Sequence, residues 1–457
     1  MIDPRVTGLA SETGNVVMGG VRPPETTGRQ IVVFADSDDD QGFDLSGAGI
    51  TNVADSRDFS DGEIAADVLQ SADATVFAEL GIAVVAADTA QLSALQAGVT
   101  SGRRVLSVSP ELVHHVLRES VLEYAQAYRD GVTDLADHLM HTNGHGMTGV
   151  LPAGTTQPTF ADTPQATWGI QAVQAISSAR SGKGVRVAVL DTGFDTSHPD
   201  FAGRNVTTQS FVAGEPPQDG HGHGTHCIGT SCGPRSPSTG PRYGVAYEAD
   251  IFAGKVLSNA GSGTDAQILA GINWAVMNRC HVLSMSLGAD VMQSHPPYSA
   301  AGARALQKGS LIIAAAGNNA DRRAGNVGFV GSPANSPEIM AVGALEQSLG
   351  MAFFSARSLP ARGGQVDIAG PGFQVLSSWP LPTRYRTISG TSMATPHVAG
   401  VAALWAEAPA GAASSCGRRS ASRASGCCSR RSTWAAASAS PRSDATGLAF
   451  PAWSSSA

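Results

Sequence analysis

The chain has 457 residues, enough for two or three domains with a sizeable core, and 42% of its residues are hydrophobic and 15% charged. This composition is typical of an ordinary globular protein, and a formal net charge of −8 argues against nucleic acid as a partner. No apolar run approaches the roughly 18 residues that a membrane span requires. Residues 1–20 contain no basic segment followed by an apolar one, so no secretory signal is visible. As read, the protein would be cytoplasmic; it would be secreted if its start were misassigned.

The first third of the chain divides into three predicted parts. Residues 1–29 are rich in Gly, Pro and Thr and are predicted to be disordered. Residues 30–118 show strand and helix patterns in the order βαββαβ, which indicates a small α+β domain of the ferredoxin-like type. Residues 119–165 are predicted to form an amphipathic helix, 119–140, and then a linker rich in Gly, Thr and Pro.

Residues 166–409 alternate strand and helix patterns, which predicts an α/β domain with a doubly wound, mostly parallel sheet. Strands are expected at 185–191, 250–255, 282–286, 311–316 and 339–344, and covering helices at 266–278 and 300–309. In such sheets the active-site groups collect beyond the carboxyl ends of the strands. Asp191, residues 286–288 and Asn318 all fall at such ends.

Residues 389–397, SGTSMATPH, precede an apolar run and predict a tight turn entering a buried helix, with Ser392 at the helix start. Amide groups of a first helical turn have no partner within the helix and attract developing negative charge. Pro396 is expected at this early position, where its missing N–H would have been unpaired anyway. Ser392 is therefore a candidate nucleophile, which still needs a base to remove its proton.

Two other stretches supply candidate partners for the serine. The apolar run that ends in Asp191 predicts a carboxylate at the tip of a buried strand. Residues 220–226, GHGHGTH, place three imidazoles among glycines, and Asp, then His, then Ser is one of the chain orders of a catalytic triad. A metal site from His221, His223 and His226 is the alternative, but the chain has no HExxH helix to support it.

The motifs DTG at 191–193, HGTH at 223–226 and GTSMATP at 390–396 together resemble the three signatures of the subtilisin-like serine proteases, the peptidase S8 or subtilase family. The resemblance covers about 168–407 and implies a serine endopeptidase that acts through an acyl-enzyme.

The resemblance also implies a role for each residue of the three motifs. Ser392 would be the nucleophile, His223 the base, and Asp191 the group that orients the imidazole. His226 would be structural and His221 an exposed neighbour.

Further segments resemble the family's oxyanion and substrate-binding parts. Residues 314–318 imply that Asn318 donates its side-chain amide to the tetrahedral intermediate, with the Ser392 N–H as second donor. Two segments would hold the substrate backbone by strand addition, and they comprise Gly261, Ser262, Gly263, Ser286, Leu287 and Gly288. Gly331 would leave room for a large apolar side chain at P1, the residue before the cleaved bond. Broad specificity with an apolar P1 preference is therefore expected.

By its position and its βαββαβ order, the domain at 30–118 resembles the inhibitor propeptide of this family, and an unrelated small α/β domain is the alternative. The resemblance implies that it chaperones folding, covers the active site and is then cut away, near or within the linker at 141–163. The expected partners are protein or peptide substrates and the chain's own propeptide in cis, and a monomer is expected. No cofactor is expected: calcium would be poorly held by residues 233–242, which contain no carboxylate and two Arg. The cysteines of the catalytic region are expected to be buried free thiols: Cys227, Cys232 and Cys280.

Residues 410–457 depart from the family, with thirteen Ala and thirteen Ser among 48 residues, and cannot bury enough apolar surface to order themselves. This bias is typical of a high-GC gene read out of frame, which resequencing would test, and a genuine low-complexity tail is the alternative. The altered tail keeps open a second function, a catalytically silent subtilisin-like protein that binds peptides. A dinucleotide-binding protein is excluded, because no GxGxxG follows the strand that ends at Asp191.

Overall fold

A computed structural model describes most of the chain between residues 24 and 407. The described ranges are 24–35, 45–60, 63–100, 105–117, 159–358 and 364–407. The helix predicted at 119–140, most of the linker and the tail at 410–457 lie outside these residues.

The larger domain is built on a seven-stranded sheet in the order β14-β13-β12-β10-β6-β8-β7, with every pair parallel. Its strands are β6 Arg186–Asp191, β7 Val206–Ser210, β8 Asp250–Lys255, β10 Val282–Met285, β12 Leu311–Ala315, β13 Met340–Leu345 and β14 Ile368–Pro371. The doubly wound parallel fold predicted from the sequence is confirmed, and all five predicted strands are present. The sequence analysis missed β7 and β14, the two strands at the edges of the sheet.

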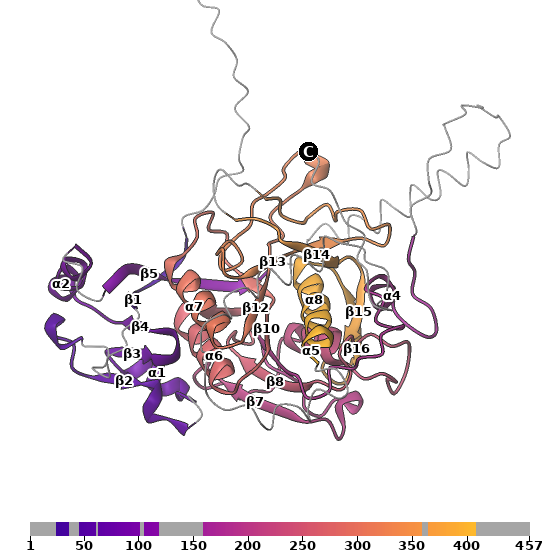
Figure 1. Ribbon diagram of the computed structural model, residues 1–457, viewed down its shortest axis with the longest axis horizontal. Helices are drawn as coiled ribbons and strands as arrows, with labels where there is room; N and C mark the ends of the chain where they lie inside the picture. Colours follow the sequence, from indigo (N-terminus) through magenta and orange to yellow (C-terminus); the bar gives the residue numbers. More distant parts are fainter. Residues whose placement is uncertain are drawn as a thin grey trace, which may run out of the picture.

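Helices cover both faces of this sheet (Figure 1). Alternate side chains of β6 point to opposite faces, so that Val187 and Val189 pack in one apolar cluster and Ala188 and Leu190 in another. The first cluster includes α5 (His223–Cys232) and α8 (Thr391–Ala406), and the second includes α6 (Asp265–Met277) and α7 (Pro296–Gln307). A short helix, α4 (Trp168–Ala172), and a hairpin of β15 (Val375–Ser378) and β16 (Tyr385–Ile388) complete this domain.

Residues 24–117 form a smaller α+β unit whose antiparallel strands have the order β5-β1-β4-β3, with a short parallel strand at one edge. Its elements are β1 Thr26–Phe34, β2 Val53–Asp55, α1 Ala66–Ser71, β3 Ala74–Phe77, β4 Ile82–Val85, α2 Thr89–Thr100 and β5 Val105–Val116. The predicted order βαββαβ is present, with β2 as an additional strand. The predicted disordered range 1–29 is too long, because β1 begins at Thr26, where Thr27 and Arg29 bind the buried carboxylate of Glu111.

One face of the smaller sheet packs on α6 and α7, as Figure 1 shows for the indigo strands. Apolar side chains of this face, such as Ile31 and Phe77, share one cluster with residues of the two helices. Arg304 of α7 is buried in the contact and donates to the carbonyl groups of Leu80 and Phe34. The smaller unit therefore contacts the larger domain through a specific interface, made of this apolar cluster and the Arg304 hydrogen bonds.

Candidate active site

The two segments predicted to hold a peptide are paired with the chain's own strand β5. They form β9 (Ser262–Thr264) and β11 (Leu287–Gly288), and β5 lies antiparallel to both. His115 faces Ser262 on one side and Gly288 on the other. The Val116 N–H also donates to the Gly261 carbonyl at 2.8 Å. An extended segment of the smaller unit therefore occupies the space between β9 and β11.

The register of β5 and β11, continued by one residue, sets Leu117 opposite Ser286. Val116 faces Leu287, and because β5 and β11 are antiparallel, the next residue of β5 lies opposite Ser286. The Ser286 carbonyl accepts the Ser392 hydroxyl at 3.2 Å. A Cβ atom added to Gly288 would lie 3.2 Å from Leu117 Cδ2, so the Leu117 side chain packs over this segment.

Ser392 is the second residue of α8, as the sequence predicts, and its side chain is buried beside Ser286. Pro396, however, lies inside the helix rather than in its first turn, so that prediction is wrong. Its missing N–H would have donated to the carbonyl four residues earlier, that of Ser392. The Ser286 hydroxyl donates to this carbonyl instead, at 2.7 Å. Pro396 therefore allows two reciprocal hydrogen bonds between Ser286 and Ser392.

His223 and Asp191 form a buried pair, with 2.8 Å between Nδ1 and Oδ1. Burial opposes the charged imidazole, but the Asp191 carboxylate outweighs it and raises the pKa of His223 well above its ordinary value. The other ring nitrogen, Nε2, is buried and has no hydrogen-bond partner among the described residues. Cys227 joins this pair to the serine, because its sulfur lies 3.8 Å from His223 Nδ1 and 3.6 Å from the Ser392 carbonyl oxygen.

The loop before His223 is held by Asp219, a residue that the sequence analysis missed. Its Oδ1 accepts from the N–H groups of His221 and Gly222 and from the Thr192 hydroxyl. Its Oδ2 accepts from the N–H and the hydroxyl of Thr225. Asp219 thereby fixes the loop to the segment after Asp191. Its only signal in the sequence is one carboxylate just before the histidine cluster, which resembles many surface aspartates.

The three neighbouring histidines have different environments. His226 is fully buried, and its Nε2 donates to the carbonyls of Val375 and Arg386. Burial lowers the pKa of His226 to about 3, so it is neutral and structural, as the resemblance implies. His221 is half-buried rather than exposed, because it packs beside Gly261. Among the described residues, the group at the spacing of metal ligands contains His223 but neither His221 nor His226.

Asn318 is fixed at the start of α8. The Thr391 N–H is 2.9 Å from Asn318 Oδ1, and the Thr391 hydroxyl is 2.8 Å from the same atom. A backbone N–H only donates, so the amide oxygen must face Thr391, and the amide nitrogen occupies the other end of the group. This nitrogen lies 3.0 Å from where a Cβ of Gly390 would be. The second donor predicted for the tetrahedral intermediate is the Ser392 N–H. It belongs to the first turn of α8 and has no partner within the helix.

Gly331 lies in the segment that packs against residues 288–290. Its N–H donates to the Ala316 carbonyl, and Ser332 forms an antiparallel bridge with Ala289. A Cβ at Gly331 would lie 2.5 Å from the Ala289 carbonyl oxygen. The close approach of two backbones therefore requires glycine here, and a role in the P1 pocket stays a prediction.

The loop at 233–242, which contains no carboxylate of its own, contacts the carboxylate of Asp200. Ser238 donates its N–H to this carboxylate at 2.7 Å, and the hydroxyl groups of Tyr243 and Tyr385 donate at 2.6 and 3.0 Å. Burial opposes the charge of this carboxylate, but these hydrogen bonds outweigh it and lower the pKa of Asp200 below its ordinary value. Within the described part, one cluster has the spacing of metal ligands, namely Asp191, His223 and Cys227. The three cysteines of this domain are buried and free, which confirms the prediction.

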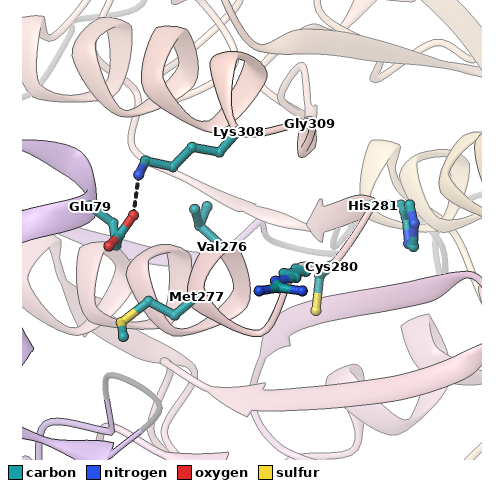
Figure 2. A pocket seen from close by; sticks show the side chains of 8 residues that line it. Glu79, Val276, Met277, Cys280, His281, Lys308 and Gly309 are labelled. Atoms are coloured by element: carbon teal, nitrogen blue, oxygen red, sulfur yellow. Dashed lines mark hydrogen bonds and ion pairs between the residues drawn. The ribbon is translucent and has the colours of Figure 1, made fainter. Parts of the chain in front are cut away.

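A hollow of about 680 Å³ lies far from these residues, at the carboxyl ends of α6 and α7 (Figure 2). Lys308 and Glu79 form an ion pair across it, joining α7 to the smaller unit. Both side chains are partly exposed, so this pair contributes about 0–1 kcal/mol. Strand β9 lies at the opposite, amino end of α6, and none of the residues that line the hollow belongs to the candidate active site.

The comparisons with known proteins match the larger domain. The subtilase family model matches residues 182–417 and so runs past the predicted end of family-like sequence at 409. M-protease from Shouchella clausii (strain KSM-K16) is 44% identical over 241 residues, which are 52% of this chain and 58% of that protein. Subtilisin Savinase from Lederbergia lenta is also 44% identical, over 82% of its length. Thermitase from Thermoactinomyces vulgaris is 41% identical over 250 residues and 84% of its length. The match thus covers less than two thirds of M-protease. No helix in the described ranges is long and apolar enough to cross a membrane.

Proposed function

The chain belongs to the subtilase family of serine proteases, and on this premise we propose that it is an endopeptidase with Ser392 as nucleophile. His223 is its base, and Asp191 orients that base. The observation that carries the proposal is the buried 2.8 Å bond between His223 and Asp191, which Cys227 links to Ser392 at the start of α8. This arrangement provides a polarised base and a local positive field at one point.

The chemistry follows from these groups. Ser392 Oγ attacks the carbonyl carbon of the cleaved bond while its proton moves to His223 Nε2. The carbonyl oxygen becomes negatively charged, and it accepts hydrogen bonds from the Asn318 side-chain amide and from the Ser392 N–H. The intermediate collapses to an acyl-enzyme as His223 gives the proton to the leaving amine. Water then attacks the ester with His223 as base, and Ser392 regains its proton.

We also propose that the unit at 24–117 is the propeptide and that the enzyme cuts it off after Leu117. The register of β5 supports this position, because continued by one residue it sets Leu117 opposite Ser286, whose carbonyl accepts the Ser392 hydroxyl. The proposed cut precedes the linker at 141–163, near or within which processing was expected from the sequence. Leu117 is itself an apolar P1 residue, in agreement with the expected preference. Backbone pairing with β9 and β11 favours broad specificity at the remaining positions.

A serine-directed phosphonate tests the proposal. The full chain should lose peptidase activity in step with labelling, and peptide mapping should place one label on Ser392. A Ser392→Ala chain should take no label. A label on another residue, or none on folded protein, would contradict the role of Ser392. The silent, peptide-binding alternative predicts no label, and no feature of the described site favours it.

A further inference from the structure

One side chain of β5 is enclosed by the larger domain. Counting back from Leu117 as P1, His114 is P4, and its side chain is fully buried. Its Nε2 lies 2.6 Å from Asp265 Oδ1 and 3.2 Å from the Tyr298 hydroxyl. The ring also meets the Tyr298 ring edge-on, with 5.4 Å between centroids. His114 therefore occupies a shaped, polar pocket rather than an apolar one.

The residues that surround His114 belong to the larger domain, including the charged one, Asp265. Asp265 is the first residue of α6, and its carboxylate is fully buried. Besides His114, it accepts from Tyr298 at 2.7 Å and His295 at 3.3 Å. The Leu112 N–H, from P6, donates to the same carboxylate at 2.7 Å. Removal of residues 24–117 would leave Asp265 with two of these four donors.

We propose that Asp265 determines specificity at P4, where this protease takes an imidazole, and that the P6 backbone N–H completes the recognition. The inference rests on the proposed function and adds a substrate class to it: extended peptides with His four residues and an apolar residue one residue before the cut. If an apolar P4 side chain covers Asp265, the buried carboxylate loses the hydrogen bond from the imidazole and cannot replace it with one from water. Phenylalanine at P4 has a ring of similar size but no donor, so it should be disfavoured about 10- to 100-fold.

The test uses the full chain after it has processed itself, and peptides copied from residues 111–117. The series is acetyl-Glu-Leu-Val-Xaa-His-Val-Leu p-nitroanilide, with Xaa as His, Phe, Ala or histidine methylated on Nε2. We expect kcat/KM to be at least about 10-fold higher for His than for the other three. Equal or faster cleavage of the Phe peptide would overturn the proposal. The methylated residue keeps the ring and replaces the donor that faces Asp265 by a methyl group.

A variant locates the effect. Asp265→Leu should abolish the preference, so that Phe is cleaved at least as well as His, whereas Asp250→Leu, the same change at the amino end of β8 and outside the site, should preserve it. Active-site titration with the phosphonate corrects each preparation for folded enzyme. If Asp265→Leu does not fold, the wild-type series still decides. A chain that labels and cleaves the Ala peptide without preferring His refutes only the inference. A folded chain that neither labels nor cleaves any peptide contradicts the proposed function.

Discussion

At the scale of single residues, the charge of His223 is governed by one neighbour, Asp191. Burial alone would lower the pKa of this imidazole, but the buried carboxylate raises it well above its ordinary value. The proposed base is the neutral form. Activity should therefore be lost at low pH and gained as the pH rises through the raised pKa, above the ordinary 6.5.

Asp191→Asn tests this coupling. The acid limb of the plot of kcat/KM against pH should move to lower pH, because the carboxylate no longer favours the imidazolium. In subtilisin itself, the reference protein of this family, loss of the triad aspartate costs about 3 × 10⁴ in kcat, and a similar loss is expected here. Asp250→Asn, on the same sheet but outside the site, is the matched control. An unmoved acid limb in Asp191→Asn would contradict the assignment.

Residue identity could be predicted only where a motif marks it. Asp191, His223 and Ser392 lie in short patterns of small residues, and the structure brings their segments together. Asp219 and Asp265 have no such pattern. Their importance depends on which backbone N–H groups the fold brings to them, and loop aspartates look alike before those groups are placed.

At the scale of elements, helices α5 and α8 each contain a buried, uncharged histidine. Burial lowers the pKa of His226 to about 3 and that of His397 to about 4. In the unfolded chain both would titrate near 6.5. The unfolded state thus binds more protons below that pH, so stability is fully present above about 6.5 and is lost as the pH falls towards 3.

Each of these histidines should cost about 1.4 kcal/mol of unfolding free energy per pH unit within this window. Urea unfolding of the Ser392→Ala chain between pH 7 and 4.5 measures the slope without self-digestion. His226→Gln should flatten it by about that amount, whereas His115→Gln, at a half-exposed position, should not. A slope unaffected by His226→Gln would show that another group drives the acid sensitivity.

The sequence predicts the strands that are strongly buried and misses those that are weakly buried. The five central strands are apolar because both faces are covered, so they stand out in the sequence. β7 is polar and half-buried, and β14 reads IAGP, with a Gly and a Pro that are disfavoured in strands, so neither gives a clear pattern. α7 begins at Pro296, earlier than predicted, because proline is well accommodated at a helix start.

At the scale of the whole molecule, the smaller unit and the larger domain share one of the apolar clusters, and Arg304 adds buried hydrogen bonds to this contact. The guanidinium is buried and binds backbone carbonyls of β1 and of the turn before β4. By contrast, Lys308, four residues later, forms a partly exposed ion pair with Glu79. The two cations should therefore differ in importance.

Arg304→Ala should weaken retention of the cleaved propeptide, because several buried carbonyls lose a charged donor, each bond worth roughly 1.5–3 kcal/mol. Lys308→Ala should change retention by less than about tenfold. Gel filtration of freshly processed protein at decreasing concentration measures the fraction that still carries residues 24–117. Equal retention of residues 24–117 in the two variants would contradict the importance of Arg304 in this interface.

The central claim is that Ser392 cuts the chain after Leu117, and intact mass with N-terminal sequencing tests it most directly. Wild-type protein should yield a new N-terminus that begins at Arg118, while Ser392→Ala remains whole. Cleavage at another bond would contradict the register at β11. Cleavage of the purified Ser392→Ala chain at the same bond and rate would contradict the serine.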